Sequence, residues 1–447
     1  MDRDLTAMPS SYPELLVATK NGKIYNVPFL QAAGMKAGKY FPLLPSDLTK
    51  IPKDDCLFHL PQRIPVGIDS QSKTFVTASK LPGFRKDIFY PVAAFTWPGY
   101  TCTYNSAYEE KKPAGKLPFF SYAAAAYYKG NFYFAATKVD QKRQHDIRFM
   151  DIQRIRNNIK KFKEMYGENR LIKHLSHCAL NFGCPGAKNF FLQRYEAPLP
   201  ASPFCNASCR GCISAGRKET SLQNRIKFVP EAKELAQIAL IHIKKNSDAV
   251  VSFGQGCEGE PLLAADTIRK AILMIREETD KGIINMNTNA SSPKALRDLF
   301  EAGLDSIRVT IASVREKYYL NYHRPRGYRF KDVIDSILLA ERFNKFTSLN
   351  YLVMPGFTDS ISEYKALRLF LRKHPINMMQ WRNMNYDPLR YFTDLGLLNH
   401  RRNKFIGIQN LIIKIKGEFP HLLGGYFNPS RRKILLTHNS ASKKGIS

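Results

Sequence analysis

The sequence predicts an α/β protein with a β-rich N-terminal domain, a central parallel sheet with helical crossovers, and a basic C-terminal extension. Strand-like segments and turn signals fill residues 12–140. Strand-like and amphipathic helical segments then alternate from about 190 to 385, and basic residues accumulate beyond 391. Alternating strands and helices are typical of βα units, whose strands pair in parallel through right-handed crossovers. We expect a β-rich domain at 1–148, a basic helical linker at 149–189, the α/β core at 190–390 and the extension at 391–447.

The turns indicate the β-rich domain. Asn21-Gly22-Lys23 separates two strand-like segments, and Lys129-Gly130-Asn131 does the same within an aromatic stretch. Such sequences favour tight hairpin turns. Prolines at 82, 91, 98 and 113 interrupt any long helix in this range. In the linker, Ile155, Ile159 and Phe162 would share one face of a single helix over 151–173.

The central zone contains six expected strands and five expected helices. The strands are 191–195, 249–253, 283–287, 306–311, 348–353 and 377–382. The helices are 230–244, 266–278, 293–301, 331–342 and 362–373, and a further helix is expected in the extension at 405–416. A sheet of this kind binds its ligands at the carboxyl ends of its strands.

Composition excludes several classes of protein. A hydrophobic fraction of 44% is enough for a packed core, which excludes a wholly disordered chain. No stretch approaches the roughly 18 consecutive apolar residues of a membrane helix. The start, Met1-Asp2-Arg3-Asp4, has early acids and no apolar block, which argues against a signal peptide. We therefore expect a cytoplasmic protein with no membrane partner.

The net charge of +30 has two interpretations. It indicates either a polyanionic partner such as RNA or a lysine-rich surface that is simply solvated. The extension alone has ten Lys and Arg residues against two acids. However, the basic stretch at 160–163 contains a single aromatic residue, Phe162, which is too few for a base-stacking platform. Nucleic acid therefore stays open as a partner.

Three of the eight cysteines fall within one short segment, Cys205-Asn206-Ala207-Ser208-Cys209-Arg210-Gly211-Cys212. In a reducing cytosol such clustering favours a metal or cluster site over disulfides. Three thiolates can bind three irons of a cubane and leave the fourth iron open to an outside ligand. Zinc is the alternative, but it normally requires a fourth ligand, and the only cysteine further along the chain is Cys257.

This segment resembles the Cys-x3-Cys-x2-Cys signature of the radical S-adenosylmethionine (SAM) superfamily. The resemblance implies a partial (β/α)6 barrel at 190–390, with a [4Fe–4S] cluster on Cys205, Cys209 and Cys212 and SAM as the second cofactor. One departure is Gly211, because the family usually has an aromatic residue immediately before the third cysteine.

Further motifs follow the expected strands in order. Gly256-Cys257-Glu258-Gly259-Glu260-Pro261 looks like the family's Gly-Gly-Glu-Pro turn, which implies that Gly259 and Glu260 bind the SAM ammonium group. Asn287-Thr288-Asn289-Ala290 resembles the Thr-Asn-Gly turn, which implies SAM contacts from Thr288 and Asn289. Arg308-Val309-Thr310-Ile311 resembles a strand of related proteins in which a polar residue reaches SAM, which implies a SAM contact from Thr310, with Arg308 as the alternative. Each motif also has a purely structural interpretation, as a turn, a helix cap or a sheet-packing position.

The resemblance implies an enzyme that cleaves SAM reductively to a 5′-deoxyadenosyl radical, which then abstracts hydrogen from a substrate. Such an enzyme needs a low-potential electron donor of the flavodoxin or ferredoxin type. The substrate is open between RNA, a small molecule and a protein. A cluster-binding protein without radical chemistry is a further alternative. Cys56, Cys102, Cys178 and Cys184 are sufficient in number for an auxiliary cluster, although the first two are equally interpreted as buried apolar residues.

Overall fold

The computed structural model describes residues 11–51, 56–84, 88–111, 114–214, 223–246, 248–398 and 404–434. The chain divides into two compact units. The β-rich unit comprises residues up to 139 together with 353–365 and 383–414, and the α/β unit comprises 140–352, 366–382 and 415 onward. The four ranges expected from the sequence stay a prediction. The boundaries of the compact units differ from these ranges, because the segments 353–365 and 383–414 belong to the same unit as the N-terminal strands.

The β-rich unit is built from antiparallel strands. They are β1 (Glu14–Ala18), β2 (Ile24–Lys36), β3 (Lys39–Pro42), β4 (Thr49–Lys50), β5 (Leu57–His59), β6 (Arg63–Asp69), β7 (Phe75–Thr77), β8 (Tyr90–Ala94), β9 (Tyr100–Cys102), β10 (Asn105–Ser106), β11 (Tyr108–Glu110), β12 (Ala123–Tyr128), β13 (Asn131–Phe134) and β14 (Ala136–Lys138). Strands β1, β2, β10 and β12 form a closed ring, since β1 and β10 each pair with both β2 and β12. Both predicted hairpins are confirmed, with Gly22 and Gly130 at the positive φ that such turns require.

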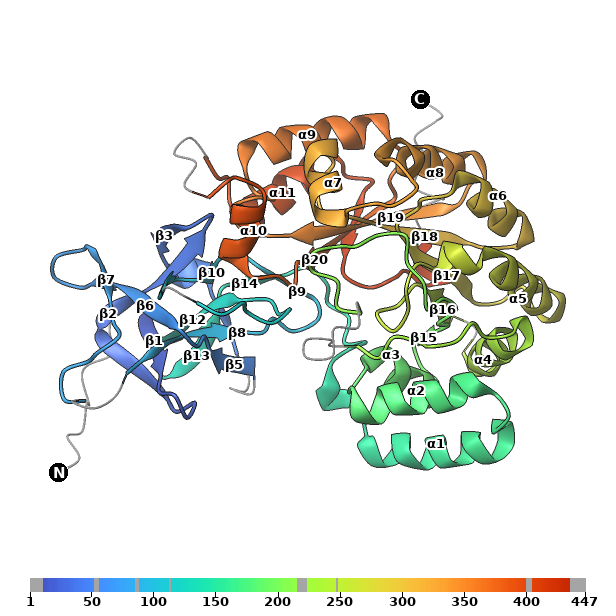
Figure 1. The fold of residues 1–447 in the computed structure, drawn as a ribbon, viewed down its shortest axis with the longest axis horizontal. Coiled ribbons are helices and arrows are strands. Elements are labelled where there is room, and N and C mark those ends of the chain that lie inside the picture. Colours follow the sequence, from blue (N-terminus) through green and yellow to red (C-terminus); the bar gives the residue numbers. More distant parts are fainter. Residues whose placement is uncertain are drawn as a thin grey trace. The chain divides into compact units, whose positions relative to one another are not determined.

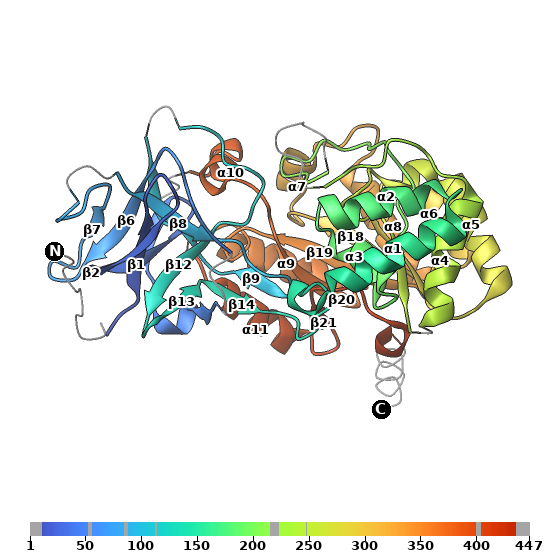
Figure 2. The same cartoon turned by 90° about the horizontal axis from the view of Figure 1, so that it is seen from below.

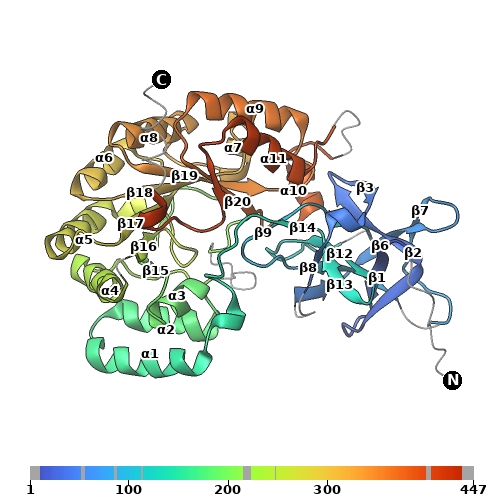
Figure 3. The same ribbon diagram turned by 180° about the vertical axis from the view of Figure 1, so that it is seen from behind.

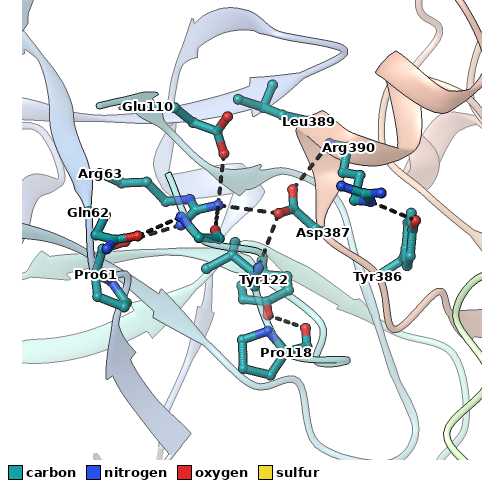
Figure 4. Close-up of polar contacts among 12 residues, drawn as sticks. Pro61, Gln62, Arg63, Glu110, Pro118, Tyr122, Tyr386, Asp387, Leu389 and Arg390 are labelled. Atoms are coloured by element: carbon teal, nitrogen blue, oxygen red, sulfur yellow. Dashed lines mark hydrogen bonds and ion pairs between the residues drawn. The ribbon is translucent and has the colours of Figure 1, made fainter. Parts of the chain in front are cut away.

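A buried arginine joins a later segment to this unit (Figure 4). Arg63 on β6 is 2% exposed, and its guanidinium donates to Glu110 at 2.7 Å and to Asp387 at 3.3 Å. Asp387 also caps helix α10 (Pro388–Asp394), because its carboxylate accepts the backbone N–H of Arg390 at 3.2 Å. One ion pair therefore holds both the strand and the start of the helix.

The α/β unit contains a parallel sheet, which confirms the predicted fold class. Its strands follow chain order: β15 (Glu196–Pro198), β16 (Val250–Phe253), β17 (Ile283–Thr288), β18 (Ser306–Ile311), β19 (Phe346–Val353), β20 (Met378–Asn383) and β21 (Leu423–Gly425). The strand expected at 191–195 is wrong, because Phe191 ends a helix and the strand begins at Glu196. Sequence reasoning also missed β21, a three-residue strand.

Besides α10, the α-helices of the described residues are α1 (Ile152–Tyr166), α2 (Arg170–Asn181), α3 (Pro185–Phe191), α4 (Ala232–Lys245), α5 (Ala265–Glu278), α6 (Pro293–Ala302), α7 (Glu316–His323), α8 (Phe330–Arg342), α9 (Ile361–Lys373) and α11 (Ile408–Glu418). The single helix expected over 151–173 is wrong. The chain breaks at Gly167, and Asn169 starts a new helix by accepting the backbone N–H of Leu171 at 2.9 Å. Helices α1 and α2 consequently lie side by side (Figures 1 and 2).

The two faces of the parallel sheet differ in chemistry. Helices α4, α5, α6 and α8 cover one face, as Figures 1 and 3 show. Buried apolar residues such as Met286, Ile307 and Val309 alternate along the strands with polar ones. Because side chains alternate between faces, the polar residues share the face away from these helices. They include Glu196, Ser252, Asn285, Asn287, Ser306, Arg308, Thr310, Ser348, Asn350, Gln380 and Arg382.

An apolar cluster fills the amino ends of the strands. Val250, Ile283, Phe346 and Met378 pack there with Ile434 from near the end of the described chain. The polar residues of this face therefore lie between the apolar cluster at the amino ends of the strands and their carboxyl ends. Within the described residues, no helix is long and apolar enough to cross a membrane.

Candidate active site

The cysteine loop follows β15 and is held by the segment after α7. The backbone N–H of Ser208 donates to the carbonyl of His323 at 3.1 Å, and that of Arg210 donates to Tyr322 at 3.1 Å. In return, the N–H of Arg326 donates to the carbonyl of Asn206 at 2.8 Å. These bonds fix the loop backbone from both sides. Sequence reasoning did not predict α7, so it missed this support.

Hydrogen-bond donors face the sulfur atoms. His323 Nδ1 lies 3.4 Å from Cys209 Sγ, while its Nε2 accepts the backbone N–H of Ala312 at 3.1 Å. A backbone N–H is always a donor, so Nε2 is unprotonated and Nδ1 carries the hydrogen that faces the sulfur. Burial lowers the pKa of His323 to about 3, which keeps the ring neutral. Arg225 Nη2 lies 3.9 Å from Cys212 Sγ and donates to Ser214 at 3.1 Å.

The three thiols are partly buried and influence one another. Burial raises the pKa of Cys209 well above its usual value, and charge on Cys212 and Cys205 raises it further. Burial, with Glu260 and Cys212 adding to it, also raises the pKa of Cys205. Three soft ligands on one loop, with N–H donors beside two of them, suit an iron–sulfur cluster.

No three His, Cys, Asp or Glu side chains in the described ranges meet the geometry for one metal ion. A cubane differs from a single ion, because each of its cysteines binds a separate iron. Three cysteine thiolates on one loop fit the ligands that a cubane requires.

The glycine turn after β16 is pressed against the start of the cysteine loop. The N–H of Gly259 donates to Ser202 at 2.7 Å, and that of Glu260 donates to Phe204 at 2.7 Å. A Cβ on Gly259 would lie 1.9 Å from the Phe204 carbonyl oxygen. Only glycine fits this close approach.

Glu258 departs from the expected motif, and the structure gives it a supporting role. It is 2% exposed, and its carboxylate accepts backbone N–H groups from Ala201 at 2.8 Å, Ser202 at 3.1 Å and Gly254. Burial nevertheless raises its pKa to about 8. Glu258 thus ties the turn to the chain that leads into the cysteine loop.

Glu260 is hydrogen-bonded to two other residues that are predicted to contact SAM, Thr288 and Asn289. Its carboxylate accepts the hydroxyl of Thr288 at 2.5 Å, the N–H of Asn289 at 2.9 Å and the N–H of Leu262 at 3.2 Å. The side chain of Asn289 in turn donates to Asn206, inside the cysteine loop, at 2.7 Å. Burial raises the pKa of Glu260 to about 7. The motifs after β16 and β17 and the cysteine loop are therefore one connected site, and sequence reasoning missed Asn206 as its link.

Thr310 and Arg308 lie on the polar face of β18. Thr310 accepts a hydrogen bond from Asn350 at 3.0 Å, which is its register partner on β19. Arg308 instead contacts Gln380 and Asn428 at 3.4 Å each. Neither is bonded to the Glu260 group in the structure, so their SAM contact stays a prediction.

The four cysteines considered for an auxiliary cluster divide between the two compact units. Cys56 and Cys102 are buried in an apolar core of the β-rich unit, as expected for apolar residues. Cys178 and Cys184 belong to the α/β unit. There Cys178 is hydrogen-bonded to Cys257 within the SAM-like turn, and this bond is the largest cause that lowers its pKa to about 5.

Residues 199–366 match the sequence model of the radical SAM superfamily. The matched range contains the cysteine loop, the glycine turn and strands β16 to β19. This range of the chain is a radical SAM domain. Members of this superfamily use a [4Fe–4S] cluster and SAM, so the resemblance stated from the motifs is confirmed.

Two curated relatives are similar over less than half of the chain. A "Probable RNA methyltransferase" from Rhodopseudomonas palustris is 27% identical over 44% of this chain and 56% of its own length. The uncharacterized protein MJ0804 from Methanocaldococcus jannaschii is 26% identical over 43% of this chain and 58% of its own. The chain thus spans little more than half the length of these two relatives.

Among solved structures, the FeFe-hydrogenase maturase HydG from Carboxydothermus hydrogenoformans aligns with a TM-score of 0.37 and 14% identity, over 60% of this chain and 68% of that one. A radical SAM methyltransferase from Sphaerobacter thermophilus aligns with a TM-score of 0.37 and 12% identity, over 51% and 63%.

Proposed function

We propose that this radical SAM protein is an enzyme that holds a [4Fe–4S] cluster on Cys205, Cys209 and Cys212 and cleaves SAM reductively. The observation that carries the proposal is the hydrogen-bonded chain from the cysteine loop through Asn206 and Asn289 to Glu260. It connects the cluster ligands to the residues expected to bind SAM. A protein that only stored a cluster would have no need of this connection.

A cluster held by Cys205, Cys209 and Cys212 would supply the electron for reductive cleavage of SAM to methionine and a 5′-deoxyadenosyl radical, the species that would abstract hydrogen from the substrate. Glu260 would accept the SAM ammonium group, since a carboxylate has more acceptor positions than its three present donors occupy. Gly259 lets the backbone of the turn approach the ligand closely. Thr288, Asn289 and Thr310 would orient the rest of SAM, and the electron would come from a flavodoxin-type or ferredoxin-type donor.

The direct test is anaerobic reconstitution followed by a dithionite-driven assay for 5′-deoxyadenosine. Wild-type protein should contain about four irons per chain and form 5′-deoxyadenosine. Cys205→Ala, Cys209→Ala and Cys212→Ala should each abolish both, whereas Cys184→Ala, in the same unit but outside the loop, should retain them. Stoichiometric zinc in place of iron would refute the proposal. Iron retained by the triple variant would indicate a second cluster.

RNA modification is a second candidate function. It is favoured by the similarity to the curated "Probable RNA methyltransferase" and by the net charge of +30. A defined RNA product, found by mass spectrometry of RNA incubated with the reconstituted protein and SAM, would decide it. The alternative of a cluster-binding protein without radical chemistry predicts no 5′-deoxyadenosine at all.

A further inference from the structure

The polar face of the parallel sheet carries two arginines, Arg308 and Arg382, whose hydrogen bonds do not involve Glu260 and its partners. Arg308 lies on β18 and Arg382 on β20, and both point to the face away from the covering helices. Arg308 is 8% exposed. Burial and the nearby Arg382 lower the pKa of Arg308 to about 9, which shows that the two positive charges act on each other.

The partners of these arginines are neutral groups. The Arg308 guanidinium contacts the amide oxygens of Gln380 and Asn428, each at 3.4 Å, while its Nε is buried without a hydrogen-bond partner. Arg382 donates to the backbone carbonyl of Tyr426 at 2.9 Å and stacks on that ring at 3.9 Å. His145 adds no charge, because burial and both arginines lower its pKa to about 3.

The nearby acids are already committed to other donors. Glu196 attracts Arg308 through space, but its carboxylate accepts the side chains of Gln255 at 2.5 Å and Asn428 at 2.8 Å. Asp140 accepts the backbone N–H groups of Tyr426 at 2.9 Å and Phe427 at 3.4 Å. Positive charge on this face is therefore incompletely balanced. A buried guanidinium without an anionic partner is unfavourable, and a bound anion would relieve this.

The place of the pair in the fold suggests what it binds. The apolar cluster around Ile434 closes the amino ends of the strands, and the Glu260 group occupies the carboxyl ends. The arginines lie on the sheet face between them. Asn350, on the strand between the two, also has a buried Oδ1 without a hydrogen-bond partner. Unpartnered donors and acceptors on one face are typical of a surface that binds a polar ligand.

We propose that Arg308 and Arg382 bind an anionic group of the substrate, a carboxylate or a phosphate. This inference rests on the proposed function, because it places the substrate beside the residues assigned to SAM. Planar guanidinium groups bind both anions through paired N–H donors, which lysine cannot reproduce. The pair would anchor the substrate against the sheet face while leaving Glu260 and its partners free for SAM.

The test uses reconstituted protein saturated with SAM, titrated anaerobically by calorimetry with inorganic phosphate and, separately, with succinate. Wild-type protein should bind one of the two, and which one distinguishes phosphate from carboxylate chemistry. Arg382→Met should weaken that binding roughly tenfold to a hundredfold. Arg382→Lys keeps the positive charge but loses the paired N–H donors of the guanidinium. Its affinity for the anion should lie between that of wild type and that of Arg382→Met. The matched control is Arg269→Met, which removes an exposed arginine on α5 and should bind like wild type.

Two results would overturn the inference: no binding of either anion by wild type, or equal binding by wild type and Arg382→Met. A third arm compares SAM with decarboxylated SAM. If Arg382→Met weakens SAM but not decarboxylated SAM, the arginine serves the SAM carboxylate and the substrate assignment is wrong. Failure of the proposed function is separate, since it would appear as absent 5′-deoxyadenosine formation with arginine-dependent anion binding retained.

Discussion

His323 is the residue whose effect on the cluster the geometry defines best. A hydrogen bond to a ligating sulfur stabilises the more negative, reduced cluster and so raises its reduction potential. We expect His323→Gln to lower the potential by about 40 mV, the equivalent of about 1 kcal/mol for one electron. Glutamine is chosen because its amide oxygen can still accept the N–H of Ala312.

The measurement is a redox titration followed by electron paramagnetic resonance. His242→Phe is the control, since His242 is a buried histidine in the same unit whose Nε2 faces the Tyr195 carbonyl instead of a sulfur. An unchanged potential in His323→Gln would mean that Nδ1 does not donate to the sulfur.

Glu260 should make SAM binding depend on pH. Its pKa is raised to about 7 by burial, and only the ionised carboxylate attracts an ammonium group. SAM affinity should therefore be present above that pKa and fall by about tenfold per pH unit as the pH drops below it. Glu260→Gln should bind SAM more weakly, with a flat profile, at unchanged iron content. Equilibrium dialysis from about pH 5.5 to 7.5 measures both, and a sloping profile in the variant would assign the titration to another group.

At the scale of elements, the Arg63 ion pair should stabilise the β-rich unit. Asp387→Asn keeps the shape of the side chain but leaves a buried guanidinium without its buried partner, which should cost about 3 kcal/mol. Glu110→Gln removes the other carboxylate, which is 35% exposed, and should cost about 1 kcal/mol or less. Urea unfolding followed by the fluorescence of the unit would show the difference. Equal midpoints for the two variants would contradict the assignment.

At the scale of the whole chain, α1 presents a basic surface. Lys160, Lys161 and Lys163 are exposed, while Phe162 between them is buried, so the helix offers charge without a stacking platform. If RNA is the substrate, changing these lysines to alanine should weaken binding and lower the slope of log affinity against log salt by about 0.7–0.9 per lost phosphate contact. Filter binding at several salt concentrations measures the slope. An identical slope in wild type and variant would mean that these lysines do not contact RNA and are simply solvated.

Part of the C-terminal extension packs into the core of the α/β unit. Ile434 packs in the apolar cluster at the base of the sheet, so removal of residues from 430 onward would damage the core. Removal of 435–447, which lie outside the described residues, takes away Lys443 and Lys444 and leaves Ile434 in place.

The sequence by itself determined the parallel sheet, most of its strands and helices, and the superfamily. These features depend on local patterns: apolar periodicity, capping residues, and the spacing of Cys205, Cys209 and Cys212 on one loop. The prediction of a strand at 191–195 was wrong because Phe190 and Phe191 suit a buried helix end as well as a strand. Only packing decides between the helix and the strand. The helix over 151–173 failed because the break at Gly167 depends on the cap at Asn169.

Only the tertiary structure decided which distant residues meet. Asn206 joins Glu260 through Asn289, His323 reaches Cys209 from a helix more than a hundred residues away, and Arg308 faces Arg382 across the sheet. Neither spacing nor periodicity encodes such contacts, because they arise from the order of strands and the direction in which each side chain points. The sequence could name the residues proposed as ligands of the cluster, whereas the hydrogen bonds to these residues and the charge on the polar face required the fold.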